Sequence, residues 1–202
     1  MNTPAVRTAT YTPLINQLWP AGSYPALRIA ALMVLGSLLL TASAKAHVPM
    51  WPVPMTMQTF VVLVLGMTYG MRLGAATVAL YLFEGAIGMP VFSGTPERGI
   101  GLAYMMGPTG GYLLGFLIAT ALIGWLAERG WDRSLPYAIA AMTIGTIVQL
   151  VPGVAYLASL VGSWDKAIAA GLTPFLVGAV VKLALAAAVL PLAWRMVEHK
   201  KG

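Results

Sequence analysis

The chain has 202 residues, of which 59% are hydrophobic and only 9% are charged, and its mean hydropathy is +0.81. Soluble domains carry about 25% charged residues, so this composition excludes an ordinary soluble protein. The net charge of +6 is spread between hydrophobic segments with no basic run, which argues against a nucleic-acid partner. The absence of cysteine from the sequence excludes disulfide bonds and thiolate metal sites.

Hydrophobic runs bounded by charges or by Pro and Gly clusters organise the chain. A spanning helix needs about 20 apolar residues to cross a hydrocarbon core of about 30 Å. The runs predict six transmembrane helices, at 26–44, 56–69, 73–91, 108–127, 136–161 and 172–194. Only Gly70, Met71 and Arg72 separate the second from the third, which predicts a tight turn at a membrane surface.

We therefore expect an all-α membrane protein, a bundle of six transmembrane helices. The six-helix substrate-binding domain covers 26–198, after an N-terminal cytoplasmic tail at 1–25 and before a basic C-terminal tail at 199–202. A piece of the first tail, at 11–19, is a candidate for lying on the membrane surface.

The distribution of Lys and Arg predicts the orientation, because these residues accumulate in short cytoplasmic loops. With the N-terminus inside, the outer connections carry only Lys45, Arg98 and Lys166. The inner side carries Arg7, Arg28, Arg72, Arg129, Arg133, Arg195, Lys200 and Lys201. Both termini are predicted to be cytoplasmic, in a multi-pass protein of the cell (inner or plasma) membrane.

The outer connections at 47–54 and 92–101 are rich in Pro and Gly. Proline holds the first of them extended and free of helix. Two interpretations stay open: these loops are simple connectors, or they form a lid over a pocket that opens to the outside.

Two charged residues lie inside predicted spans, Glu84 and Lys182. Glu84 follows Arg72 by 12 residues and Lys182 precedes Arg195 by 13, which places both roughly 18 to 20 Å from the inner surface at 1.5 Å per residue. Matched depth permits a structural ion pair, or two charges that line a pocket in which Lys182 meets a carboxylate. Neutral polar residues at suitable positions to complete such a pocket are Gln58, Tyr81, Tyr104, Thr109, Tyr112, Gln149 and Tyr156.

No arrangement typical of catalysis is present in the sequence. The two histidines, His47 and His199, fall in a predicted loop and in the tail, so no span contains a Ser–His pair. No HExxH motif or carboxylate cluster predicts a metal site. The glycine-rich segment 107–111 lacks the Gly-Lys-Ser/Thr ending that binds nucleotide phosphates. We expect no catalytic residue, metal or cofactor, and uphill transport would need a partner or an ion gradient.

Four segments, taken together and in this order, carry a resemblance to a known family. They are PVPMTMQT at 52–59, GAIGMPVF at 85–92, GPTGGYLLGF at 107–116 and PFLVGAVVK at 174–182. Over about 26–194 the chain resembles the BioY family, the biotin-binding S components of energy-coupling factor (ECF) vitamin transporters.

The resemblance implies a six-helix fold with an outward-facing biotin pocket and cytoplasmic termini. It also implies two kinds of partner, a transmembrane coupling protein and a pair of ABC-type ATPases, although some BioY-like proteins work without them. Small residues on the first helix contact the coupling protein in this class, which makes Ala26 and Ala30 candidates.

The ligand anchors follow from biotin's chemistry, an apolar fused ring with a urea and a carboxylate. Lys182 or Arg98 is expected to meet the carboxylate, and Gln58, Glu84 and the backbone at 107–111 the urea. The wider set of expected substrate-binding residues is Lys182, Glu84, Arg98, Gln58, Gly107, Thr109, Tyr112 and Gln149.

One departure from the family concerns its sixth-helix motif, Gly-Asp-x-x-Lys, which here reads Gly178-Ala-Val-Val-Lys182. Ala179 replaces the expected carboxylate, and our hypothesis is that Glu84 supplies that acceptor instead. Two other functions stay open, an ion-coupled transporter of another small organic acid, and a membrane scaffold or enzyme with a structural Glu84–Lys182 pair.

Overall fold

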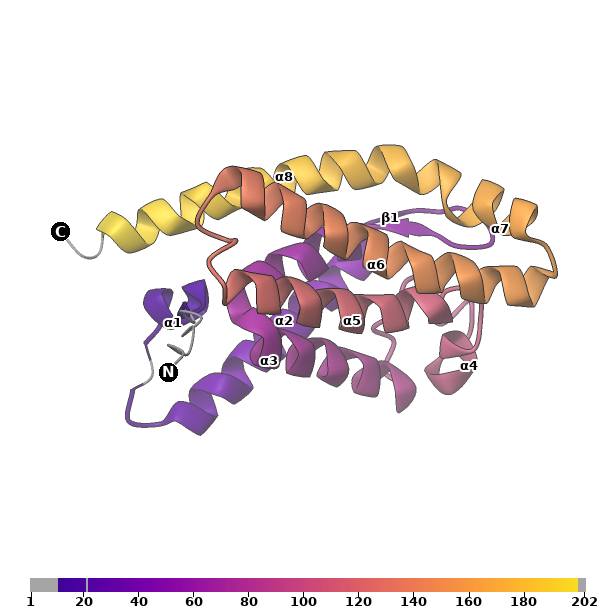
Figure 1. The fold of residues 1–202 in the computed structure, drawn as a ribbon. Helices are drawn as coiled ribbons and strands as arrows, with labels where there is room; N and C mark the ends of the chain where they lie inside the picture. The colour runs from indigo at the N-terminus through magenta and orange to yellow at the C-terminus, as the bar shows by residue number, and fades with distance from the viewer. Residues whose placement is uncertain (1–10, 21, 200–202) are drawn as a thin grey trace, which may run out of the picture.

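The computed structural model describes residues 11–20 and 22–199, and it is mostly helical (Figure 1). Parts of both predicted tails, including Arg7, Lys200 and Lys201, lie outside the described residues. The helices are α1 (Leu14–Leu18), α2 (Pro25–Lys45), α3 (Gln58–Ala86), α4 (Gly101–Met105), α5 (Gly110–Ala127), α6 (Leu135–Val161), α7 (Trp164–Gly171) and α8 (Thr173–His199). Two short antiparallel strands, β1 (His47–Val48) and β2 (Met55–Thr56), form a hairpin after α2.

Five helical stretches within the described ranges are long and apolar enough to cross a membrane. They are α2, α3, α5, α6 and the stretch Trp164–Val189, which contains α7 and most of α8. This finding supports a multi-pass membrane protein. The count is five rather than the predicted six because α3 combines the second and third predicted spans.

A break inside α3 explains that difference. Gly70 has φ 79° and ψ −179°, a backbone conformation that glycine adopts without steric cost. On either side of the break, Gln58 Nε2 donates to the Tyr81 hydroxyl at 2.7 Å, whereas residues 23 positions apart in one straight helix would be about 35 Å apart. The two arms of α3, 58–69 and 71–86, therefore fold back on each other, and the predicted turn at 70–72 is present.

Helix boundaries follow local sequence signals. Pro25 occupies the first turn of α2, where its missing N–H removes no helical hydrogen bond. Gly162 ends α6 in the left-handed conformation at φ 68°. Ser163 then caps α7 by accepting from the Lys166 backbone N–H at 3.4 Å.

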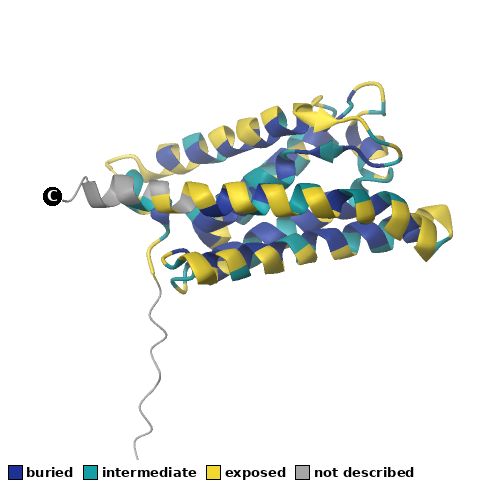
Figure 2. Ribbon diagram, turned by 90° about the horizontal axis from the view of Figure 1, so that it is seen from above, coloured by how far each residue is buried: buried dark blue, intermediate teal, exposed yellow. Residues whose placement is uncertain are grey.

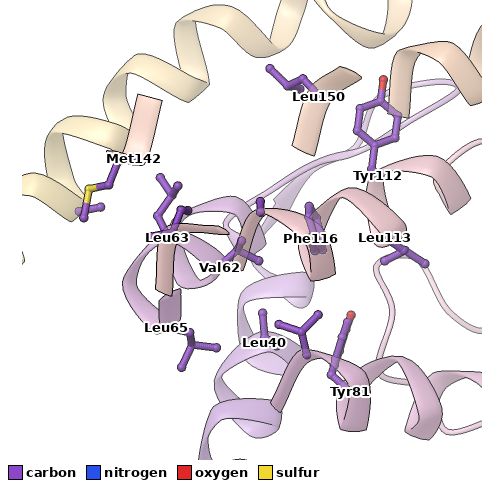
Figure 3. Packing of buried hydrophobic residues seen from close by; sticks show 14 of the residues in the cluster. Leu40, Val62, Leu63, Leu65, Tyr81, Tyr112, Leu113, Phe116, Met142 and Leu150 are labelled. Atoms are coloured by element: carbon purple, nitrogen blue, oxygen red, sulfur yellow. The ribbon is translucent and has the colours of Figure 1, made fainter. Parts of the chain in front are cut away.

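The interior of the bundle is built around α5, which packs against α3 on one side and α6 on the other. Figure 2 shows the buried residues on the inward faces of the helices and the exposed ones on the outside. In the close view, Val62, Leu63, Phe116 and Met142 contribute to one continuous apolar cluster (Figure 3). A Cβ added to Gly115 would lie 2.4 Å from the backbone oxygen of Gln149, so only glycine permits this approach of α5 to α6.

The two ends of the bundle differ in character. One end contains α1, the start of α2, the loop between α5 and α6, and the end of α8 (Figure 1). It is here called the arginine-rich end, because Arg28 lies at the start of α2, Arg72 follows the break in α3, and Arg129 and Arg133 lie in the loop between α5 and α6. The opposite end, here called the loop end, carries the β1–β2 hairpin, the loop 87–100, α4 and α7 (Figure 1).

The segment that contains α1 is packed onto the arginine-rich end. Leu14 is fully buried, and Arg28 Nη2 donates to the side chain of Asn16 at 2.8 Å. The Arg133 guanidinium lies over the Tyr11 ring at 4.8 Å and over the Trp194 ring at 4.5 Å. These contacts join the start of the described chain to the α5–α6 loop and to α8.

Candidate ligand-binding site

A pocket at the loop end receives side chains from nearly every element of the bundle. The hairpin, the first arm of α3, the loop after α3, α4, α5, α6 and α8 all contribute to its wall. Its lining consists of Val53, Pro54, Thr56, Gln58, Thr59, Phe92, Ser93, Tyr104, Thr109, Tyr112, Leu113, Phe116, Gln149, Leu150, Phe175 and Lys182. Most of these groups are apolar or aromatic and a few are polar, which is the usual composition of a small-molecule site.

The two predicted outer connections are joined to each other beside this pocket. Lys45 Nζ donates to the Phe92 backbone oxygen at 2.9 Å and to Thr95 Oγ1 at 3.1 Å. Arg98 Nη2 donates to the Met50 backbone oxygen at 2.9 Å. Both loops also contribute wall residues, so they are part of the site rather than simple connectors.

Aromatic packing holds the loop after α3 in place. Phe92 is stacked on Tyr104 of α4 with ring centroids 4.9 Å apart, and it meets Tyr81 edge to face at 5.4 Å. Burial raises the pKa of the Tyr104 phenol above its ordinary value, so this hydroxyl stays protonated and able to donate at neutral pH.

Lys182 is the cation of the pocket. It lies seven residues after Phe175, two turns along the inward face of α8, and only 6% of its surface is exposed. Among the described residues, no hydrogen bond or ion pair to its ammonium group is found. Because a buried charge without a partner is unfavourable, this position suits a ligand that brings an oxygen acceptor or a negative charge.

Three neutral polar atoms of the lining are also buried and without a hydrogen-bond partner among the described residues. They are Thr59 Oγ1, Ser93 Oγ and Gln149 Oε1. Ser93 is 2% exposed and Gln149 is 1% exposed. Buried polar groups in proteins are nearly always hydrogen-bonded, so their gathering around one pocket indicates a polar ligand.

Other polar residues of the lining are held by the protein itself. Gln58 is fixed between Tyr81, to which Nε2 donates, and Thr56 Oγ1, which donates to Oε1 at 3.2 Å. The Tyr112 hydroxyl donates to the Gly171 backbone oxygen at 2.7 Å, which joins α5 to the end of α7. These contacts fix the orientation of the Gln58 and Tyr112 side chains. Lys182 and Gln149 are not held in this way by any described residue, and they are therefore better placed to bind a ligand.

Six of the predicted candidates meet in this pocket, namely Lys182, Gln58, Tyr104, Thr109, Tyr112 and Gln149. Arg98 and Gly107 line a neighbouring hollow at the loop end, which shares Tyr104 and Thr109 with the main pocket. Two other candidates lie away from the lining: Tyr81 supports Gln58 from behind, and the Tyr156 hydroxyl donates to the Met106 backbone oxygen at 2.8 Å.

Glu84 differs most from its expected place. It is half-buried in the second arm of α3, where its carboxylate accepts a hydrogen bond from Ser37 Oγ of α2. It does not line the pocket, and no contact in the described structure pairs it with Lys182. Equal predicted depth did not imply proximity, because Glu84 is directed to α2 whereas Lys182 lines the pocket. This geometry supports neither Glu84 as a substitute for the carboxylate missing at Ala179 nor the structural ion pair.

Thr59 and Ser93 were not among the predicted site residues. Thr59 directly follows Gln58 at the start of a helix, and Ser93 lies in a Pro/Gly-rich loop, where a hydroxyl has no distinctive spacing. A signal existed only for Thr59, which ends the family-like segment 52–59. Ala26 and Ala30, the predicted partner contacts, are exposed on the first turns of α2.

Fold and site together define a class, a multi-pass helical membrane protein with a small-molecule pocket between the ends of its helices. A family model described as the BioY family matches residues 15–199. The chain is 37% identical over 156 residues to the probable biotin transporter BioY of Pyrococcus horikoshii, covering 77% of this chain and 90% of that protein. It is 36% identical over 149 residues to the biotin transporter BioY of Thermotoga maritima, covering 74% and 85% of the two chains.

This chain belongs to the BioY family. Its fold is similar to that of a crystal structure of the S-component for biotin from an ECF-type ABC transporter, with a TM-score of 0.75, 20% sequence identity, and coverage of 90% of this chain and 95% of that one. The curated relatives are named as transporters rather than as enzymes. The resemblance seen in the sequence is thereby confirmed.

Proposed function

We propose that this protein is the membrane-embedded, high-affinity biotin-binding component of a vitamin uptake system, and that it is not an enzyme. The relatives named as biotin transporters support the ligand. In this proposal each arm of α3 crosses the membrane, so that six helices span it. The loop end faces outward and captures biotin, and both termini are in the cytoplasm of a cell membrane.

The buried ammonium group of Lys182 is the observation that carries the site. It binds the carboxylate of biotin, because a negative charge compensates a buried cation best. Arg98 is the less suitable anchor, since its guanidinium already donates to the backbone oxygens of Met50 and Pro52. The Gln149 Oε1 atom accepts from a ureido N–H, and the hydroxyls of Thr59 and Ser93 donate to the ureido oxygen.

Partners belong to the same proposal. A transmembrane coupling protein and ABC-type ATPases supply the energy, and the structural neighbour supports this because it is itself a component of an ECF-type ABC transporter. Ala26 and Ala30 permit a partner helix to approach α2 closely, because small exposed side chains reduce the distance between helix backbones.

Calorimetric titration of biotin into detergent-purified protein tests the proposal. Lys182→Met keeps the length of the side chain and removes the charge, and a lost charge-assisted hydrogen bond of about 1.5–3 kcal/mol weakens affinity by about 10- to 150-fold. Lys166→Met, at an exposed position on α7, is the matched control and should bind as the unmodified protein does.

A biotin amide, which lacks the negative charge, identifies the group that Lys182 binds. If Lys182 holds the carboxylate, the amide binds the unmodified protein weakly, and Lys182→Met weakens it little further. If Lys182→Met weakens the affinity for biotin and for the amide equally, Lys182 contacts the urea rather than the carboxylate. If biotin does not bind the unmodified protein, the proposal is wrong, and the alternative of an ion-coupled transporter for another small organic acid is favoured.

A further inference from the structure

An apolar groove lies on the outer surface of the arginine-rich end, away from the ligand pocket. Residues of α3 and α5 form it, where α5 crosses the turn of α3. Its walls are Met71, Leu117, Ile118, Ala121, Leu122 and Trp125. Met71 and Ile118 are exposed at 41% and 45% of their surface, so the groove is open to the membrane side of the bundle.

The walls of the groove are held close together by glycine. A Cβ added to Gly124 of α5 would lie 2.3 Å from the backbone carbon of Gly70, so α5 touches the turn directly. The carboxylate of Glu128 accepts the Met71 backbone N–H at 2.9 Å and reinforces this crossing. The groove is therefore a fixed feature of the fold.

Two arginines stand at the arginine-rich end of this groove. The Arg129 guanidinium lies 3.4 Å from the centroid of the Trp125 ring, and its Nη1 donates to the Trp125 backbone oxygen at 3.1 Å. Arg72 is exposed and follows Met71 directly. Within the described part of the chain, neither guanidinium is paired with a carboxylate, and Glu128, the carboxylate at this crossing, is directed to the backbone of the turn.

We propose that this groove binds an anionic phospholipid, with one acyl chain along α5 and the phosphate between Arg72 and Arg129. An acyl chain matches an apolar groove that faces the hydrocarbon, and arginines that no carboxylate in the described residues neutralises attract a negative headgroup at the membrane surface. A guanidinium also matches the geometry of a phosphate oxygen pair. Neither arginine belongs to the ligand pocket, so the proposal is independent of the identity of the transported molecule.

A second groove provides a comparison within the same molecule. It lies between α6, α7 and α8 at the loop end, and Trp164 and Ile168 are among its apolar wall residues. The charged residues that follow Trp164 are Asp165 and Lys166, of opposite sign. This groove therefore offers apolar contact without a net positive charge, and it should show no preference for an anionic lipid.

Quenching of tryptophan fluorescence by lipids with brominated acyl chains tests the proposal in reconstituted full-length protein. The probes are brominated phosphatidylglycerol and brominated phosphatidylcholine at equal fractions in unbrominated phosphatidylcholine. The fluorescence of the Trp125→Phe variant, subtracted from that of the unmodified protein, gives the contribution of Trp125. The same subtraction with Trp164→Phe gives the contribution of Trp164, in the comparison groove.

We expect enrichment of phosphatidylglycerol at Trp125 of about fivefold for each arginine at low salt, with a decrease at high salt. Arg72→Gln combined with Arg129→Gln should remove the preference at Trp125, leave quenching by phosphatidylcholine, and leave ligand binding intact. Equal quenching by both lipids in the unmodified protein would overturn the proposal. A preference that persists in the double variant, or an equal preference at Trp164, would overturn it as well.

Discussion

Lys182 and Gln149 lie deep in the pocket without partners among the described residues, and this is the main feature at the residue scale. Such groups lower the stability of the ligand-free protein, because each loses hydration without gaining a hydrogen bond. The same groups strengthen binding when a ligand satisfies them. Stability and affinity should therefore change in opposite directions when they are replaced.

Gln149→Leu is a direct test of this opposition. The substitution replaces a buried amide with an apolar group of similar size, so we expect unchanged or higher thermal stability in the absence of ligand. Affinity for biotin should fall by about tenfold, the effect of one hydrogen bond of about 1–1.5 kcal/mol. The control is Thr120→Val, at a buried hydroxyl that is hydrogen-bonded within its own helix, and it should leave the affinity unchanged. If Gln149→Leu binds biotin with normal affinity, Gln149 does not contact the urea.

Asp132, in the loop between α5 and α6, predicts a pH dependence of stability. Only 4% of its surface is exposed, and burial raises the pKa of its carboxyl from 3.8 to about 6. Between these values the folded state binds more protons than the unfolded state, so the free energy of unfolding falls as pH rises from about 4 to about 6. The decrease should be up to about 3 kcal/mol, and stability should be constant above that range.

Asp132→Asn should remove this pH dependence and raise stability at pH 7, as measured by unfolding in detergent at a series of pH values. Asp165→Asn, at an exposed position on α7, is the control and should keep the slope of the unmodified protein. A slope that is the same in both variants would show that Asp132 is not its source.

At the scale of elements, the approach of α5 to α6 determines where the pocket lies. Gly111 and Gly115 of α5 face Pro152 and Gln149 of α6, with no space for side chains between the two backbones. Because Gln149 also lines the pocket, the close contact between α5 and α6 fixes the position of this part of the pocket wall.

Gly115→Ala should separate α5 from α6, because the added Cβ would lie 2.4 Å from the Gln149 backbone oxygen. We expect a loss of about 1–3 kcal/mol in stability, typical of overpacking, together with weaker binding of biotin. Leu114→Ala, whose side chain is exposed on the other face of α5, should change stability by less than about 0.5 kcal/mol. Equal effects of the two substitutions in thermal unfolding would contradict this account.

For the whole molecule, the separation of an arginine-rich end from a loop end supports one orientation in the membrane. Under the positive-inside rule, the orientation that we propose has the arginine-rich end in the cytoplasm. In that proposed orientation the loop end, with the pocket, faces the outside.

The lack of native cysteine makes this orientation testable. Single cysteines at Tyr24→Cys, before α2, and Asp165→Cys, on α7, occupy exposed positions at opposite ends. A membrane-impermeant maleimide added to intact cells should label the second and not the first, while both react after lysis. The reverse pattern would invert the proposed orientation.

The sequence was sufficient to predict a membrane protein, the approximate limits of most of the long helices and the turn at Gly70, because hydropathy, charge and glycine conformation are local properties of the chain. The six membrane-crossing helices that it predicted differ from the five found in the described residues. The sequence also identified the family, through four separated segments, and six of the residues that meet in the pocket. Tertiary structure alone decided which polar groups lack partners, and it added Thr59 and Ser93 to the wall. It also separated Glu84 from Lys182: depth along a helix can be counted from sequence, but the face that each helix turns to its neighbours depends on how all the helices pack.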